Sequence, residues 1–233
     1  MGKKFLFLVL IWFANLSHAQ LHEVGISLGG SNYVGDIGPT ALLRPNAFAY
    51  GIVYKYNRNP RIAYRASITA MGIKADNADS KNEIRQLFDT PVDKTIVEFT
   101  GGIEFNFFEY KISHWKRART PYFIFELAFF HYLKAEKTAT GYDYNSQMGV
   151  ALPFGFGYKA QLANNLVLAG EIRIRYTYTD DLDDSLFYKE EVVKYHPENS
   201  KFNNPDTNDW YAFTGLTLTY TFGRPLHYTT KRR

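Results

Sequence analysis

The sequence has 233 residues, with 27 Lys and Arg, 23 Asp and Glu, and no cysteine. The absence of cysteine excludes a disulfide framework and a lipid anchor on an amino-terminal cysteine. Acids and bases are nearly balanced once Lys3 and Lys4 are set aside with the export signal described next, so the chain lacks the basic concentration of a nucleic-acid-binding domain.

The amino terminus has the order of a secretory signal. Lysines precede an apolar run over residues 5–13, and the small residues Ser17 and Ala19 follow it. This order predicts export and cleavage after Ala19. The apolar run is too short for a membrane-spanning helix, which takes roughly 20 residues. We therefore predict that residues 1–19 are a signal peptide that is removed.

Eight segments of the remaining chain alternate between apolar and polar residues and are bounded by turn-forming residues. They cover residues 22–30, 47–56, 62–74, 95–108, 122–134, 149–161, 166–179 and 210–222. Each is long enough for a tilted membrane crossing, which takes roughly 9 to 11 residues. We predict an all-β fold, an eight-stranded antiparallel transmembrane β-barrel of the outer membrane over residues 20–223, followed by a basic periplasmic tail over 224–233.

The last segment shows the alternation most clearly. Its apolar side carries Leu216, Leu218, Tyr220 and Phe222, and its hydroxyl side carries Thr217, Thr219 and Thr221. In a transmembrane barrel the apolar side faces lipid and the polar side faces the lumen. Aromatic residues make up 17% of the chain, which is typical of the girdles that such barrels place at both membrane interfaces.

The predicted connections alternate in length. Residues 57–61 and 162–165 form short turns, whereas the segments 31–46, 75–94, 135–148 and 180–209 are long. Short turns on the periplasmic side and long loops outside are the habit of outer-membrane barrels. The turn at 109–120 is longer than the other turns on the periplasmic side and is rich in bases.

The two faces of the strands differ in polarity. Large apolar residues would point at lipid at positions 26, 28, 99, 103, 105, 123, 125, 127, 129, 152, 154, 156, 172, 174 and 176. The opposite face carries charged residues, namely Arg65, Glu98, Glu104, Glu126, Glu171, Arg173 and Arg175. Eight strands leave an interior only wide enough for side chains, so these charges must pair with each other. We predict a closed polar lumen rather than a pore.

A soluble sandwich or a lipocalin-like barrel is the alternative fold, in which the apolar faces would point inward. The alternation by itself does not separate the two folds. Strand length, the asymmetry of the loops and the terminal aromatic residue favour the membrane barrel.

The sequence gives little support for catalysis or for metal binding. His131 could meet Ser146 or Asp143 near the outer rim, but no serine lies in a nucleophile-elbow motif. Acidic and amide side chains stand close in sequence at Asp180, Asp181, Asp183, Asp184, Asn208 and Asp209. They could supply oxygen ligands to calcium, but the spacing does not match an EF-hand, and a solvated acidic loop explains them better. We predict no enzyme, no cofactor and no metal.

Basic residues gather on the predicted periplasmic side. In the long turn the aromatic Trp115 is followed by Lys116, Arg117 and Arg119. In the tail the basic residues are Arg224, Lys231, Arg232 and Arg233. Bases beside a membrane often anchor to anionic headgroups. An aromatic residue among arginines is also typical of protein interfaces, so a docking surface for a periplasmic partner is the second interpretation.

Several stretches together resemble one known family. They are LHEVGISLGGSNYVGDIG at 21–38, YGIVYKYNRNPRIAYRASIT at 50–69, EFNFFEY at 104–110, TPYFIFELAFFHY at 120–132, YTYTDDLDD at 176–184 and NDWYAFTGLTLTYTFGRP at 208–225. This combination is similar to the PorG family, small outer-membrane β-barrel components of the type IX secretion system. The resemblance covers essentially the whole mature chain.

The resemblance implies a non-enzymatic role in protein secretion and, in gliding relatives, in motility. Such a barrel would hold a periplasmic ring, made of a lipoprotein and its partner, to the outer membrane. The expected partners are therefore outer-membrane lipid and this ring, with no nucleic acid and no small-molecule substrate. The alternative is a barrel that binds a ligand or transports it through long extracellular loops.

Overall fold

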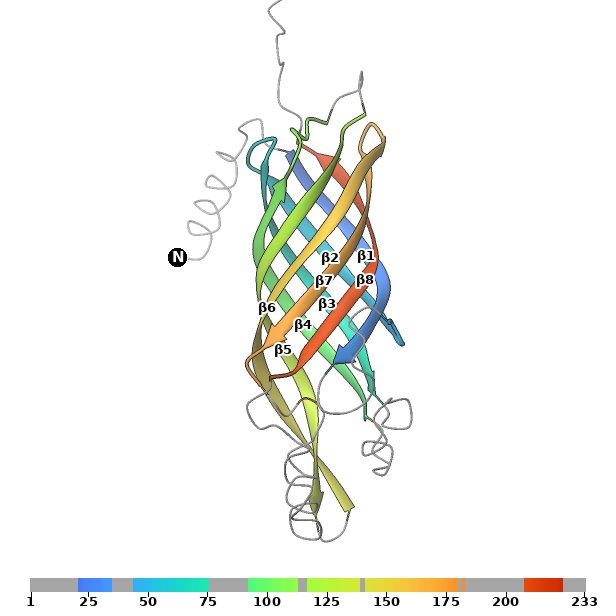
Figure 1. Ribbon diagram of the computed structural model, residues 1–233, viewed down its shortest axis with the longest axis vertical. Coiled ribbons are helices and arrows are strands. Elements are labelled where there is room, and N and C mark those ends of the chain that lie inside the picture. The colour runs from blue at the N-terminus through green and yellow to red at the C-terminus, as the bar shows by residue number, and fades with distance from the viewer. Residues whose placement is uncertain are drawn as a thin grey trace, which may run out of the picture.

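The computed structural model describes residues 21–34, 44–75, 92–112, 117–138, 141–179, 182 and 208–223. Their strands form one closed antiparallel barrel in chain order, shown in Figure 1. The strands are β1 (Leu21–Val34), β2 (Ala47–Asn57), β3 (Ile62–Ala75), β4 (Val92–Asn106), β5 (Arg119–Thr138), β6 (Gly141–Ala163), β7 (Leu166–Thr177) and β8 (Trp210–Phe222). The predicted fold class is confirmed.

The barrel closes where its first and last strands meet. β1 pairs with β8 from Val34↔Trp210 to His22↔Phe222, so the hydrogen-bonded ladder runs the full height of the wall. Closure leaves no strand edge exposed to hydrocarbon, where an unpaired backbone group would cost several kcal/mol.

One predicted connection is wrong. The segment 135–148 was expected to be a loop, but β5 and β6 continue through it and pair as far as Thr138↔Gly141. The resulting hairpin projects beyond the lower rim in Figure 1. The sequence of this hairpin alternates only weakly between apolar and polar residues, because a two-stranded hairpin in water does not need an apolar face. The sequence therefore did not indicate strands there. The other ends differ from the prediction by a few residues.

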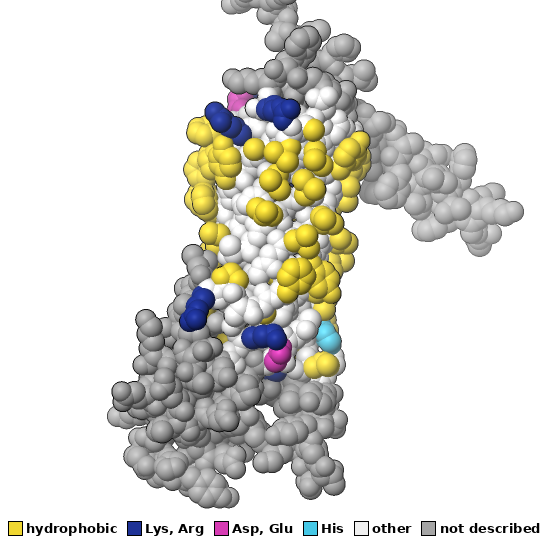
Figure 2. Space-filling model, turned by 90° about the vertical axis from the view of Figure 1, so that its right-hand side faces the viewer, with side chains coloured by type: hydrophobic (Ala, Val, Ile, Leu, Met, Phe, Trp, Pro, Cys, Tyr) yellow, Lys and Arg dark blue, Asp and Glu magenta, His cyan; other side chains and the backbone are white. Residues whose placement is uncertain are grey.

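Outward side chains are apolar and inward side chains are polar through the body of the barrel. On β5, for example, Phe125 is 61% exposed whereas its neighbour Glu126 is 1% exposed. Figure 2 shows the resulting belt of apolar side chains, with Lys and Arg at both of its ends. Soluble monomers rarely expose apolar patches beyond a few hundred Å². This inside-out polarity belongs to a barrel in lipid, and the soluble alternative is wrong.

Aromatic residues mark both borders of the belt. At one border the His22 ring stacks on Phe222, with 5.4 Å between ring centroids, and its Nδ1 lies 2.7 Å from the Tyr54 Oη. At the other border Trp210 packs edge-on against Tyr176 at 5.0 Å. Such rings prefer membrane–water interfaces. The border with His22 lies at the end with the short turns, uppermost in Figure 1, which we assign to the periplasm.

The predicted signal peptide and the predicted tail lie outside the described residues. Within the described residues, no helix has the length and apolarity needed to cross a membrane.

Candidate functional site

The interior of the barrel is filled by a network of buried ion pairs. Its centre is Arg65, whose Nη1 and Nη2 donate to Oε1 and Oε2 of Glu171, each at 2.8 Å. The Nε of the same guanidinium lies 3.2 Å from Glu126, and its Nη1 lies 3.5 Å from Glu104. These groups come from β3, β4, β5 and β7, so the network ties together different sides of the wall.

Towards the periplasm the network continues through two lysines. Lys55 Nζ lies 2.7 Å from Glu104 Oε2, and Lys159 pairs with the other oxygen of the same carboxylate. The Tyr122 hydroxyl donates to Glu171 at 2.8 Å. Because these side chains lie across the bore, they close it.

Towards the outside a second pair dominates. Arg175 Nε donates to Glu98 Oε2 at 3.0 Å, and Arg175 Nη2 donates to Glu98 Oε1 at 2.5 Å. The Tyr211 hydroxyl donates to Glu98 Oε2 at 2.9 Å. Arg173 reaches Glu126 at 3.3 Å and lies over the ring of Phe213 at 4.7 Å. Cations held over aromatic faces in this way gain roughly 0.5 to 2 kcal/mol.

All the charged residues predicted for the lumen are buried there, and sequence reasoning missed three more: Glu23, Lys55 and Lys159. Glu23 accepts hydrogen bonds from Asn57 Nδ2 and Thr219 Oγ1, both at 2.8 Å. Each missed residue has inward parity in its strand, and that parity was the available signal.

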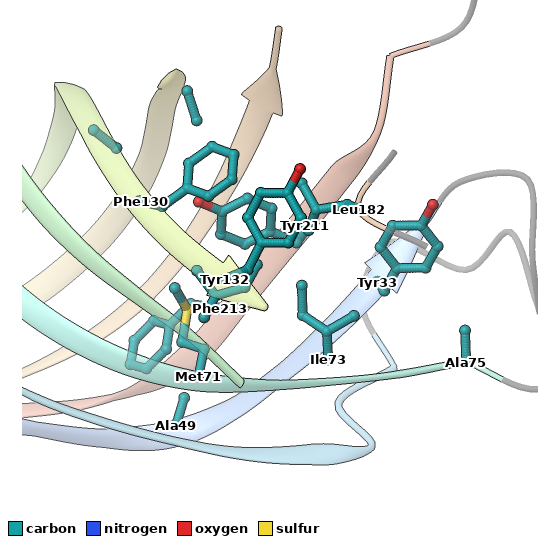
Figure 3. Close-up of a cluster of buried hydrophobic side chains, with 13 residues drawn as sticks. Tyr33, Ala49, Met71, Ile73, Ala75, Phe130, Tyr132, Leu182, Tyr211 and Phe213 are labelled. Carbon is teal, nitrogen blue, oxygen red and sulfur yellow. The ribbon is translucent and has the colours of Figure 1, made fainter. Parts of the chain in front are cut away.

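The part of the lumen nearest the outside is apolar, which the prediction of a polar lumen did not include. Figure 3 shows the cluster, which comprises Tyr33, Ala49, Met71, Ile73, Ala75, Ile96, Ala128, Phe130, Tyr132, Ala151, Leu182, Tyr211 and Phe213. A bore this narrow can be sealed by packing as well as by charge pairing. The polar network and the apolar plug therefore close the bore in series.

Leu182, from the connection after β7, completes the plug. Its side chain is wholly buried, its backbone N–H donates to Asp209 Oδ2 at 3.0 Å, and its carbonyl accepts from Lys94 Nζ at 2.9 Å. The other oxygen of Asp209 accepts from the Tyr33 hydroxyl. Asp209 thus pins the connection into the mouth of the barrel.

This arrangement accounts for part of the acidic group that sequence analysis considered for calcium. Asp209 is bound by protein donors, and Asn208 donates to the Tyr176 hydroxyl at 2.5 Å. The four aspartates at 180, 181, 183 and 184 lie outside the described residues. The part of the chain that the structure describes holds no cluster of three or more His, Asp or Glu suited to a metal ion.

Tyr110 covers the periplasmic end of the lumen. Its backbone N–H donates to the Pro60 carbonyl at 2.9 Å, and its ring lies 4.1 Å from Lys159 Nζ. Burial, followed by the negative charges of Glu23 and Glu104, raises the pKa of the Tyr110 hydroxyl far above its ordinary value. A tyrosine hydroxyl is neutral at physiological pH even in water, and burial at this position strengthens that preference.

The predicted docking residues are only partly visible. Arg117 and Arg119 are exposed at the periplasmic rim, whereas Trp115 and Lys116 lie outside the described residues, as do the four tail bases Arg224, Lys231, Arg232 and Arg233. Exposed Glu109 accepts a 2.6 Å hydrogen bond from Lys111, which together with the lysine charge lowers the pKa of that carboxyl.

The structure does bring His131 and Ser146 together. His131 Nε2 and Ser146 Oγ are 2.7 Å apart on the outward face near the outer rim. Among the described residues His131 has no carboxylate partner, and the Asp143 side chain is not described. A pair without an acid to orient the imidazole is not a triad.

The fold and the sealed bore together define a class, the small closed β-barrels of the outer membrane. Within that class the chain belongs to the DUF6089 family, described as a domain of unknown function, whose match covers residues 2–231. A comparison with curated proteins gave no match.

Solved structures with a similar fold are also outer-membrane proteins. Ail, the attachment invasion locus protein of Yersinia pestis, is 14% identical, with 87% of this chain and 99% of that chain covered and a TM-score of 0.48. Neisserial surface protein A is 12% identical, with 88% of this chain and 97% of that chain covered and a TM-score of 0.48. A major outer membrane protein from Thermus thermophilus is 16% identical, with 88% of this chain and 100% of that chain covered and a TM-score of 0.47. Likeness at this level says nothing about the function of this chain.

Proposed function

We propose that this protein is an outer-membrane anchor of the type IX secretion system, holding a periplasmic lipoprotein ring to the membrane. The resemblance to the PorG family supplies the particular machine. In gliding organisms the same role would extend to motility.

The observation that carries the proposal is the sealed lumen. The bidentate Arg65–Glu171 pair, the apolar plug and the stopper Tyr110 leave no described path through the bore. A barrel that passes nothing can act only through its surfaces. On the periplasmic side the described surface is rich in arginine, which supports a docking role there.

Affinity purification from detergent-solubilised outer membranes tests the proposal. One variant replaces Trp115 with alanine and Lys116, Arg117 and Arg119 with glutamate, and a second lacks residues 226–233. We expect both to form folded barrels, and we expect ring proteins to co-purify with the wild type only. The matched control reverses the charge of Arg44, an exposed base on the opposite side. Normal co-purification and normal secretion in both variants would remove the idea.

A second candidate is a surface-binding barrel, favoured by the hairpin of β5 and β6 that projects on the extracellular side. In that case a ligand would bind the outer loops and the periplasmic side would be incidental. A transport version predicts a steady conductance in a planar bilayer, whereas the anchor predicts none. Loss of ligand binding on deleting the hairpin tip, with secretion intact, would favour this candidate.

A further inference from the structure

The periplasmic mouth is covered by two segments that are fastened to each other. The turn between β2 and β3 offers the Pro60 carbonyl to Tyr110 N–H at 2.9 Å and to Asn106 Nδ2 at 3.2 Å. The Arg61 carbonyl accepts from Asn106 N–H at 2.8 Å. The segment after β4 therefore crosses the mouth beside this turn, and the two form one platform.

Phe108 stands exposed on this platform with a fixed backbone. Its N–H donates to Thr120 Oγ1 at 2.9 Å, and the preceding residue, Phe107, donates to the Pro121 carbonyl at 3.0 Å. Phe107 packs on Phe123 at 4.9 Å along the outer wall, but Phe108 has none of the ring contacts seen there and is 63% exposed. An aromatic side chain held on an ordered backbone loses little entropy on binding.

One arginine lies beside this phenylalanine, and a second lies in the same turn as the first. Arg61 donates from Nη1 to the Phe107 carbonyl at 2.7 Å, which holds its guanidinium beside Phe108. Arg58 is exposed in the same turn. Within the described part of the chain neither arginine forms an ion pair with a carboxylate, in contrast to the buried arginines of the lumen.

The lipid headgroups are a poorer match for this platform than a protein is. Arg119 continues the outward face of β5 and so lies where headgroups can reach it. Arg58 and Arg61 instead lie past the aromatic border formed by Tyr54 and Tyr64, on the turn bonded to the segment across the mouth. Arginine beside a rigid aromatic side chain is the composition of protein-interface anchors.

We propose that Phe108, Arg58 and Arg61 are the anchoring contacts for an acidic segment of a periplasmic protein. Carboxylates of that segment pair with the guanidinium groups, and an apolar side chain covers Phe108. The proposal deepens the docking role proposed above and rests on it. It adds the platform to the basic turn as part of the docking surface.

The direct test uses the full mature protein in nanodiscs of zwitterionic phosphatidylcholine and a fluorescent peptide of alternating Glu and Gly. We expect Arg58→Glu with Arg61→Glu to weaken peptide binding at least about 10-fold, equivalent to about 1.4 kcal/mol. Phe108→Ser should leave binding of this peptide, which lacks apolar side chains, within about 2-fold but weaken a version with one Leu in place of a central Gly. Arg44→Glu with Lys74→Glu, exposed bases on the opposite rim, is the matched control and should bind both peptides as the wild type does.

Equal peptide affinity for the wild type and the platform variant would overturn the proposal. A second outcome would also overturn it: the peptide does not bind, the wild type floats with phosphatidylglycerol vesicles, and the platform variant does not. That outcome would identify a lipid anchor. Ring co-purification separates this proposal from the proposed function. If ring proteins co-purify unchanged with the platform variant, the platform is not the anchor, and the secretion role still stands. If no ring protein co-purifies even with the wild type, the secretion role is wrong, and the peptide assay alone decides on the platform.

Discussion

Arg65 and Glu171 face each other across the barrel interior as a two-pronged ion pair, with both N–O distances at 2.8 Å and both side chains wholly buried. The pair joins β3 to β7, which are not neighbours in the wall. It therefore acts as a strut across the bore as well as a seal.

Removing one partner of this strut should destabilise the barrel strongly. We expect Arg65→Met to lower the free energy of unfolding by about 3–5 kcal/mol, because the buried Glu171 would lose its two-pronged partner and only the longer contacts of Arg173 would remain for Glu171 and Glu126. Replacing both partners, as Arg65→Met with Glu171→Met, should be less harmful than the sum of the single changes, with a coupling of about 0.5–3 kcal/mol. Urea unfolding in lipid vesicles, followed by tryptophan fluorescence, measures these differences. The control is Arg58→Met at the exposed turn, and an equal loss there would contradict the strut.

Adjacent glycines on β4 provide a matched pair for testing the packing of the lumen. A Cβ added to Gly102 would lie 2.6 Å from the Cα of Glu126, whereas one added to Gly101 would meet nothing within 4 Å. We expect Gly102→Ala to lower stability by about 1–3 kcal/mol through overpacking. Gly101→Ala points at lipid and should change stability little. The same unfolding assay decides, and equal effects at both positions would show that β4 is placed with the wrong register.

The membrane barrel could be predicted from the sequence because lipid imposes a strict period on every strand. Residues such as Phe125 and Glu126 have no freedom to exchange faces, so parity alone assigned them. Parity could not reveal that the bore is sealed partly by apolar packing. Phe130 and Phe213 point inward, and glycines give their rings room: a Cβ added to Gly149 on β6 would overlap the Phe130 ring, and one added to Gly215 on β8 would lie 2.6 Å from the Phe213 ring.

The candidate site was less predictable than the wall. Lys55 lies between Tyr54 and Tyr56. This composition is typical of a segment at the membrane interface, so the sequence did not indicate that Lys55 belongs to the lumen network. Tyr110 and Phe108 lie in a connection, where no period applies, and their positions depend on long-range hydrogen bonds to Pro60 and Thr120. Contacts of this kind carry no local sequence signal.

The pinning of Leu182 can be measured with a thiol probe, since the chain has no cysteine. We expect Leu182→Cys to resist a membrane-impermeant maleimide on intact cells, whereas Arg44→Cys at the exposed rim should react. Asp209→Ala removes the acceptor of the Leu182 N–H, a loss of about 1–3 kcal/mol. In that background the labelling rate at Leu182→Cys should rise about 10-fold or more. Rapid labelling with Asp209 intact would mean that the plug is open in cells.

Phe222 ends the last strand at the seam where the barrel closes. It pairs with His22 across β1 and β8, and the two rings stack at 5.4 Å. We expect Phe222→Asp to prevent accumulation of folded barrel in the outer membrane, because it places a charge on the lipid face and removes an aromatic contact of about 0.5–1.5 kcal/mol. Phe222→Tyr keeps the ring and should insert normally. Heat-modifiable migration of the outer-membrane fraction on gels distinguishes folded from unfolded protein. Undiminished insertion of Phe222→Asp would show that the closing strand tolerates a charge at its end and that the seam does not depend on this ring.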